Sequence, residues 1–256
     1  MKLSIITINY NNLNGLKKTV ESVISQTYLD FEYIIIDGAS TDGSKEVIEK
    51  NSDRFSYWVS ENDHGIYNAM NKGILKAKGD YLLFLNSGDW FIDAQILENT
   101  ISSVKDADIV YADGYIENEN GLRTLIKIPE EPGLSFFSKT SLFHPSSFIK
   151  RELFEKYGLY NEDNKIVSDW EFFIKTMLIN KVSYKKIPTI ISVIEENGIS
   201  RNPSYAGILK DEIRTTLARY FTEEELASIF IPSQEKKVLP EKKAKIITRL
   251  FNLFKN

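Results

Sequence analysis

The chain has 256 residues, 42% of them hydrophobic and 27% charged, so it can bury the core of a globular domain rather than remain disordered. It has no cysteine, which excludes a disulfide framework, a Cys-ligated zinc site and a thiol nucleophile. The net charge is -4, but the last 24 residues carry +5, so the rest of the chain carries -9. An acidic body argues against general nucleic-acid binding, which needs a basic surface.

The first residues, MKLSIITINY, predict a strand rather than a targeting segment. They carry one Lys, and Asn9, Asn11 and Asn12 interrupt the apolar run too early for a signal peptide. No run of about 18 apolar residues occurs in the sequence. We therefore expect a cytoplasmic protein without a membrane span.

Short apolar runs alternate with amphipathic segments through the first half of the chain. The runs are LSIITI, EYIII, SYWVS and YLLFL, and they are followed by GLKKTVESVISQ, DGSKEVIEK, GIYNAMNKGILKAKG and DAQILENTI. This alternation is typical of parallel strands covered by helices on both faces. The predicted fold class is α/β with a mostly parallel central sheet. Further helices are expected over 203–230, one of them starting at Thr222, where TEEELASIF carries a T-x-x-E pattern.

Polar residues follow each predicted strand, where ligands bind in open α/β sheets. The segments are Asn9–Asn12, Asp37–Gly43, Glu61–Gly65 and Asn86–Asp89. Such residues also make turns and helix caps, and Ser40, Thr41 or Asp42 could cap the helix that contains Lys45. Asp37 directly follows its strand, several residues before that helix, and is better placed to accept hydrogen bonds from a ligand.

Three motifs, SIITINYNN, YIIIDGASTDGS and SENDHGIYNAMNKGILKAKGDYLLFLNSGD, resemble in order and spacing the N-terminal half of a family-two glycosyltransferase of the type A fold. The resemblance is to the members that build bacterial surface polysaccharides such as colanic acid. It continues more weakly through FHPSSF and VSDWEFF to NGIS. It implies hexosyl transfer from a nucleoside diphosphate sugar, expected to be a UDP-sugar, to a saccharide hydroxyl with inversion.

The resemblance also implies a set of residues that bind the donor. They are Thr7, Asn9, Tyr10, Asp37, Asp63, Gly65, Asn86 and Ser87. In this reading Asp37 hydrogen-bonds the base, while Asp63 and Gly65 lie near the N-terminus of the next helix, where free backbone N–H groups favour a diphosphate.

The fourth strand ends in a motif that departs from the family. Family members have Asp-x-Asp here, often followed by another Asp, whereas this chain reads Asn86, Ser87, Gly88 and Asp89. Asp89 is the expected ligand of a Mg or Mn divalent cation, because Mg²⁺ can be held by one or two carboxylates when substrate phosphates and water complete its shell. The alternative is that these residues only turn the chain and cap a helix at Asp93–Val104.

In the second half of the chain, a hairpin is expected to turn at 119–121. The resemblance implies that this half binds the acceptor. His144 and Trp170 are expected at the acceptor cleft, although a lone histidine is also commonly structural. Ser168 and Glu171 form an S-x-x-E pattern that predicts a capping box. Asp169 matches the catalytic base, which accepts the proton of the acceptor hydroxyl.

The domain organisation follows from these segments. Residues 1–230 are expected to form one glycosyltransferase domain, with a nucleotide-sugar half over 1–95 and an acceptor half over 96–230. Residues 231–256 form a basic tail with apolar residues at helical spacing, which fits either a peripheral membrane helix or a helix packed on the body. The acceptor would then be lipid-linked.

Two other functions fit part of the pattern. A nucleotidyltransferase would be expected to carry a Gly-rich, basic phosphate loop after the first strand, which NYNNLNG lacks. A non-catalytic sugar-nucleotide-binding protein that has lost its metal site is the second alternative.

Overall fold

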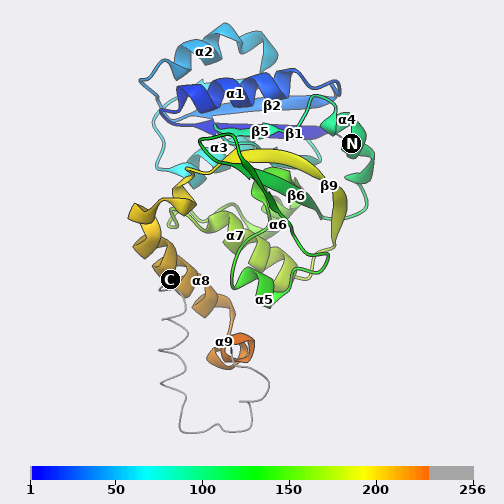
Figure 1. The fold of residues 1–256 in the computed structure, drawn as a ribbon, viewed down its shortest axis with the longest axis vertical. Helices are drawn as coiled ribbons and strands as arrows, with labels where there is room; N and C mark the ends of the chain where they lie inside the picture. The colour runs from blue at the N-terminus through cyan, green and yellow to red at the C-terminus, as the bar shows by residue number, and fades with distance from the viewer. Residues whose placement is uncertain (1, 231–256) are drawn as a thin grey trace.

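The computed structural model describes residues 2–230 (Figure 1). Their strands form one sheet in the order β3-β2-β1-β4-β8-β6-β9-β5, with β7 paired to β6. The strands are β1 (Leu3–Asn9), β2 (Phe31–Asp37), β3 (Tyr57–Ser60), β4 (Tyr81–Phe84), β5 (Asp89–Phe91), β6 (Ile109–Glu117), β7 (Arg123–Ile126), β8 (Ser147–Lys150) and β9 (Tyr184–Glu195). The predicted α/β class is confirmed.

Helices connect and cover these strands. They are α1 (Leu13–Ile24), α2 (Ser44–Lys50), α3 (Ile66–Lys76), α4 (Ile96–Thr100), α5 (Leu134–Phe137), α6 (Glu152–Tyr157), α7 (Ser168–Phe173), α8 (Ala206–Tyr220) and α9 (Glu223–Phe230). A π-helical segment, Ile174–Ile179, continues α7. No helix within residues 2–230 is long and apolar enough to cross a membrane.

Alternate residues of the central strands enter two separate cores, one on each face of the sheet. Ile5 of β1 packs in the core that contains α1, α2 and α4, whereas its neighbour Ile6 packs in the core that contains α3, α6 and α7. This is the period-2 alternation of strand side chains. The chain is therefore layered, with helices on both faces as predicted, and Figure 1 shows α1 and α2 on one side of the sheet and α6 and α7 on the other.

The first four strands in space, β3, β2, β1 and β4, are parallel, and their register aligns the carboxyl ends. Asn9 at the end of β1 lies opposite Asp37 at the end of β2, and Asp37 lies opposite Ser60 at the end of β3. The polar residues that follow these strands therefore gather at one edge of the sheet.

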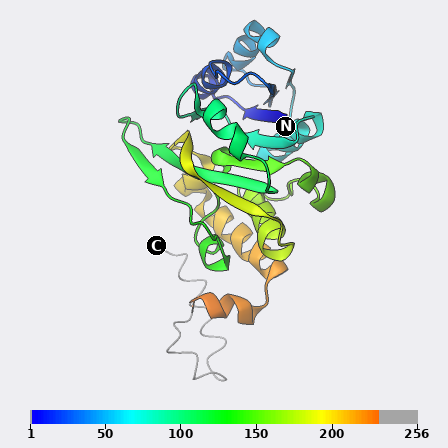
Figure 2. The ribbon, with the colours of Figure 1, turned by 90° about the vertical axis from the view of Figure 1, so that its right-hand side faces the viewer.

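Strands from the second half of the chain reach the same edge. β6 and β9 run parallel and finish with Glu117 opposite Glu195, and Asp89 of β5 lies opposite Ile194. The predicted hairpin is confirmed, since β6 and β7 are antiparallel and Gly121 between them has a φ of +75°. This hairpin protrudes from the sheet in Figure 2.

Two local predictions differ from the structure. The segment expected to be a helix over Asp93–Val104 contains α4, only Ile96–Thr100, followed by a 3-10 turn. Asp89–Phe91 form β5, which pairs with β9, so residues 86–89 lead into an edge strand instead of capping that helix. A three-residue strand has too little sequence pattern to predict.

The last two described helices extend away from the sheet (Figures 1 and 2). α9 begins with a capping box, because Thr222 Oγ1 accepts from Glu225 N at 3.3 Å and the Glu225 carboxylate accepts from Thr222 N at 2.7 Å. The predicted start at Thr222 is confirmed. The basic tail, 231–256, lies outside the described residues.

Candidate active site

Asp37 joins three of the strand ends. Its side chain is fully buried and accepts four hydrogen bonds: from Asn9 Nδ2 at 2.7 Å, Ser40 Oγ at 2.6 Å, Ser40 N at 3.0 Å and Ser60 Oγ at 2.6 Å. Four donors match the acceptor capacity of one carboxylate. Asp37 therefore fixes β1, β2 and β3 relative to one another, and its expected hydrogen bond to the base, for which one of these donors would have to give way, stays a prediction.

Tyr10 and Asp63 meet at Gly38, the residue after Asp37. A methyl group on Gly38 would lie 2.5 Å from Asp63 Oδ2 and 3.1 Å from Tyr10 Cδ2, so the two side chains crowd this glycine. Tyr10 is 68% exposed, which makes its ring available for stacking. Asp63 Oδ1 accepts from Gly65 N at 2.9 Å and thereby shapes the turn into α3.

Other residues near these strand ends have internal roles. Thr7 is fully buried and donates to Leu85 O at 2.6 Å, so it lies behind the surface formed by the strand ends. Asp42 accepts from Ser44 N at 3.1 Å just before α2, but the N-cap residue of that helix is Gly43 and no side chain caps it, while Ser40 binds Asp37. The assignment of Thr7 to the donor site stays a prediction.

The polar hook, residues 86–89, is anchored by one threonine of α1. Thr19 Oγ1 accepts from Gly88 N at 3.0 Å and lies 2.7 Å from Asp89 O. Ser87 Oγ donates to Asn9 Oδ1 at 2.5 Å, which ties the hook to the end of β1. Gly88 has a φ of +98°, a conformation that favours glycine. The hook is therefore held rigidly against the carboxyl ends of β1, β2 and β3, which we name the donor edge because the donor is expected there.

The hook gathers oxygen atoms that can act as ligands of a cation. Burial raises the pKa of Asp89 to about 8, and the neighbouring Glu195 carboxylate adds to this, whereas the hydrogen bond from Asn86 N lowers it. Asn86 Oδ1 is buried without a hydrogen-bond partner. Glu195 Oε2 lies 3.3 Å from the position that a Cβ on Gly88 would take. These oxygens fit a divalent cation.

The residues of the hook could supply only part of the coordination shell of a divalent cation. Within residues 2–230 no group of three or more His, Asp or Glu side chains could hold a metal ion. A cation at the hook would thus take one or two carboxylates, with substrate oxygens and water as its other ligands, which is the usual arrangement for Mg²⁺.

Lys18 of α1 brings a positive charge close to the hook. Its Nζ lies 3.2 Å from the centroid of the Trp90 ring, 3.3 Å from Glu117 Oε1 and 3.8 Å from Glu195 Oε1. Sequence reasoning missed Lys18, Glu117 and Glu195. Their carboxylates come from the ends of β6 and β9, which no local motif identifies.

Asp169 lies in the first turn of α7 and is half-buried. Tyr67 OH of α3 is 2.7 Å from Asp169 Oδ1 and 2.6 Å from Ile166 O. The single hydroxyl proton is therefore shared between two acceptors. Because Asp63 and Gly65 immediately precede α3, this helix links the donor edge to Asp169.

The capping box predicted from Ser168 and Glu171 is wrong. α7 already begins at Ser168, and Ser168 Oγ accepts instead from Asn161 N at 2.6 Å. The Glu171 carboxylate accepts from Asn164 Nδ2 at 2.7 Å and from Tyr220 OH at 3.0 Å. These partners lie outside the helix start, so tertiary contacts override the local capping pattern.

The two residues expected at the acceptor cleft are both buried. His144 is 7% exposed, its ring is stacked on Phe84 at 4.9 Å, and its Nε2 is 3.0 Å from Tyr160 OH. Burial lowers the pKa of His144, whereas the charge of Asp169 raises it. Trp170 Nε1 donates to Phe137 O at 2.8 Å. Both side chains support the site from behind.

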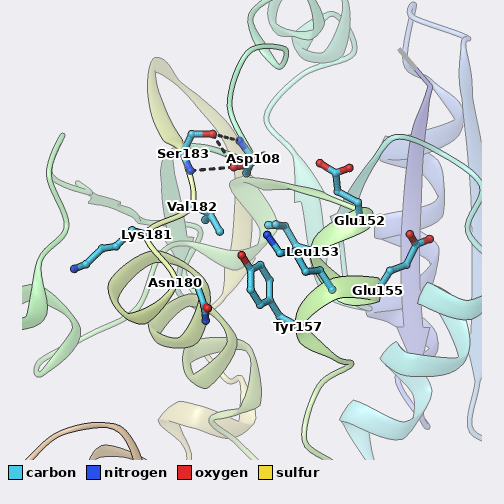
Figure 3. Close-up of a pocket in the computed structure, with 10 residues that line it drawn as sticks. Asp108, Glu152, Leu153, Glu155, Tyr157, Asn180, Lys181, Val182 and Ser183 are labelled. Carbon is cyan, nitrogen blue, oxygen red and sulfur yellow. Dashed lines mark hydrogen bonds between the residues drawn. The ribbon is translucent and has the colours of Figure 1, made fainter.

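A cavity of about 630 Å³ lies elsewhere, at the amino-terminal ends of β6 and β9 (Figure 3). Its polar groups already have partners: Asp108 Oδ2 accepts from Ser183 N at 3.0 Å and Ser183 Oγ at 2.8 Å. Glu152 pairs with Lys150 at 2.9 Å. The cavity is at the sheet edge opposite the carboxyl ends of β1, β2 and β3, so it does not belong to the site built there.

Comparisons with known proteins agree with this geometry. An uncharacterized glycosyltransferase of Mycobacterium tuberculosis is 34% identical over 186 residues, which cover 69% of each chain. S. aureus TarS 1–349 in complex with UDP-GlcNAc superposes with a TM-score of 0.67 at 15% identity, covering 99% of this chain and 80% of that one. The mannosyltransferase PcManGT from Pyrobaculum calidifontis, in complex with GDP-Man and Mn²⁺, gives 0.63 at 15% identity, covering 97% and 69%.

These structural likenesses show the type A fold expected from the sequence. The family model described as Glycosyl transferase family 2 matches residues 4–165, well over half of the chain. The matched segment contains the strand ends and the hook and stops shortly before Asp169. The chain belongs to glycosyltransferase family 2.

Proposed function

We propose that this glycosyltransferase moves a sugar from a nucleoside diphosphate sugar to a saccharide hydroxyl, with inversion at the anomeric carbon. The observation that carries the proposal is the hook, where the buried Asn86 Oδ1 has no hydrogen-bond partner and burial raises the pKa of Asp89, beside the carboxyl ends of β1, β2 and β3. The sugar nucleotides bound by TarS and PcManGT support this donor class. The expected donor is a UDP-sugar.

The donor would lie along the carboxyl ends of β1, β2 and β3. The exposed Tyr10 ring can stack on the base, and Asn9 and Asp37 fix the strand ends around it. Gly65 has a φ of +114° and open space around its Cβ position, so the N-terminus of α3 can approach a diphosphate closely. Asp63 holds that turn in place.

The hook would hold the divalent cation, either Mg²⁺ or Mn²⁺. Asp89 and Asn86 would contribute oxygens from the hook, and Glu195 would contribute a carboxylate from the end of β9. When bound, the cation stabilises the negative charge that grows on the leaving diphosphate. The Mn²⁺ in PcManGT supports this assignment.

Asp169 would act as the base. Its carboxylate takes the proton of the acceptor hydroxyl while that oxygen forms a bond to the anomeric carbon and the bond to the diphosphate breaks on the opposite face. The contact with Tyr67 OH at 2.7 Å orients the carboxylate. His144 and Trp170, packed behind it, are proposed to shape the acceptor side.

The acceptor is proposed to be a lipid-linked saccharide of a surface polysaccharide pathway, met at the inner face of the cell membrane. The support is the composition of the tail, 231–256, which places apolar and basic residues at helical spacing. Peripheral binding of this kind keeps a cytoplasmic enzyme near the reactive end of its substrate.

The test is a titration with UDP-GlcNAc and GDP-mannose, with and without Mn²⁺, followed by release of the nucleotide. Asp169→Asn should lower turnover by about 10²- to 10⁴-fold and leave donor affinity nearly unchanged, because only the base is lost. Asp163→Asn is the matched control, since Asp163 is an exposed carboxylate in the same loop. Equal turnover in both variants would reject Asp169 as the base, and binding without release would favour the non-catalytic alternative.

A further inference from the structure

α8 folds back onto the segment that precedes Asp169, residues 161–168, which we name the base loop. Glu212 of α8 accepts two hydrogen bonds from this loop: Oε1 from Lys165 N at 2.7 Å and Oε2 from Ile166 N at 3.0 Å. One carboxylate thus binds two successive backbone N–H groups, and hydrogen bonds to an ionised acceptor are the stronger kind. The loop backbone is fixed from outside the family-matched segment, 4–165.

The same helix, α8, also contacts α7 at Glu171, which follows Asp169 in the chain. Glu171 is only 5% exposed and receives the Arg219 guanidinium and, at 3.0 Å, the Tyr220 hydroxyl. A buried carboxylate that lost its cationic partner would be strongly destabilising. α8 therefore brackets Asp169 between Ile166 and Glu171.

Ile166 connects the contacts of α8 to the carboxylate of Asp169. Its carbonyl oxygen and Asp169 Oδ1 lie 2.6 and 2.7 Å from Tyr67 OH, which has one proton for both. The position of the Ile166 carbonyl therefore decides how much of that hydrogen bond Asp169 receives. The backbone N–H of Ile166, which is joined to that carbonyl through the Ile166 Cα, is the group that Glu212 holds.

We propose that Glu212 is a positioning residue for Asp169, acting through the base loop and the shared hydroxyl of Tyr67. The inference rests on the proposed role of Asp169 as base. Glu212 makes no contribution to donor binding, because its contacts lie on the base loop and the donor edge is formed by other strands.

Docking of α8 does not itself depend on Glu212. Leu217 is 5% exposed in the core beneath the sheet, and Ile208, Leu209 and Ile213 pack against the same core. This apolar face accounts for the attachment of the helix. The hydrogen bonds from the loop backbone to Glu212 are therefore not needed to attach α8, and they position the base loop.

The experiment compares Glu212→Gln with Asp211→Asn in the full chain. Gln keeps the shape but offers one acceptor oxygen in place of two, whereas Asp211 is exposed and contacts Arg214 of its own helix at 3.4 Å. In Glu212→Gln we expect kcat to fall about tenfold, the equivalent of one hydrogen bond, with donor Kd unchanged. Amide exchange at Lys165 and Ile166 should speed up, and Asp211→Asn should match the wild type in every measurement.

A double-mutant cycle with Tyr67→Phe separates positioning from stability. If Glu212 acts through Tyr67, the double variant should be no slower than the slower single variant. Additive losses, an equal loss of donor affinity, or wild-type kcat in Glu212→Gln would each overturn the inference. Failure of the wild type to release nucleotide from any sugar nucleotide would instead reject the proposed function on which it rests.

Discussion

Asp89 should make the stability of the metal-free protein fall as the pH rises. Burial raises its pKa from 3.8 to about 8, and the Glu195 charge adds to this. Between pH 5 and 7 the folded protein therefore keeps a proton that the unfolded chain has already released. Stability is lost with rising pH wherever the folded state binds more protons, by at most about 1.4 kcal/mol per pH unit for one group.

Over two pH units the loss reaches about 3 kcal/mol, a large part of the 5–15 kcal/mol that stabilises a typical domain. His144 acts in the opposite direction, because burial lowers its pKa below 6.5 and stability then increases as the pH rises toward 6.5. The wild type must therefore be compared with Asp89→Asn, which retains His144 and removes only the carboxyl titration.

The assay is urea unfolding at pH 5, 6 and 7 in EDTA, followed by tryptophan fluorescence. The free energy of unfolding of the wild type, relative to Asp89→Asn, should decrease as the pH rises. Adding Mn²⁺ should reverse the decrease, because the cation binds the ionised carboxylate, and its affinity should rise about tenfold per pH unit. An identical pH slope in the two proteins would refute a raised pKa at Asp89.

Three further predictions concern the hook and the tail. Asp89→Ala should abolish transfer and the metal-dependent gain in nucleotide affinity, whereas Asn86→Ala should have a milder effect on both, as measured by calorimetry and turnover. Gly88→Ala and Gly121→Ala, both at positive φ, should each lower the free energy of unfolding by about 1–2 kcal/mol, and Gly88→Ala should lose more because its Cβ would also lie 3.3 Å from Glu195 Oε2. Truncation after Pro232, beyond the described residues, should abolish salt-sensitive flotation with anionic liposomes and spare donor binding; an insoluble truncated protein would place the tail in the core instead.

The parts of the fold that depend on local pattern were predictable from the sequence. The four apolar runs became parallel strands, the hairpin formed at Gly121, and Thr222 starts α9. Each depends on residues close together in the chain, such as turn glycines or a cap three residues from its partner. The edge strand β5 escaped prediction because three residues carry no period.

Much of the site depends on contacts between distant segments, which a single sequence does not reveal. Lys18 pairs with Glu117, 99 residues away, and Tyr67 contacts Asp169 across 102 residues. The S-x-x-E pattern at Ser168 was misleading for the same reason, since Arg219 from α8 takes the Glu171 carboxylate. Local capping was therefore outcompeted by an ion pair between the buried Glu171 carboxylate and the half-exposed Arg219 side chain.

The absence of the family's Asp-x-Asp carboxylates from residues 86–89 can be explained by electrostatics. Two further aspartates, at positions 86 and 88, would place more negative charge beside Asp89, whose ionisation burial already disfavours. Asn86 and Gly88 avoid that repulsion, and the Ser87 hydroxyl ties the hook to Asn9. Among residues 2–230 the hook then has too few carboxylates to hold a cation strongly alone. In the proposed function the diphosphate oxygens of the donor complete the shell, so we expect cation and donor to bind cooperatively, each raising the affinity of the other by the same factor.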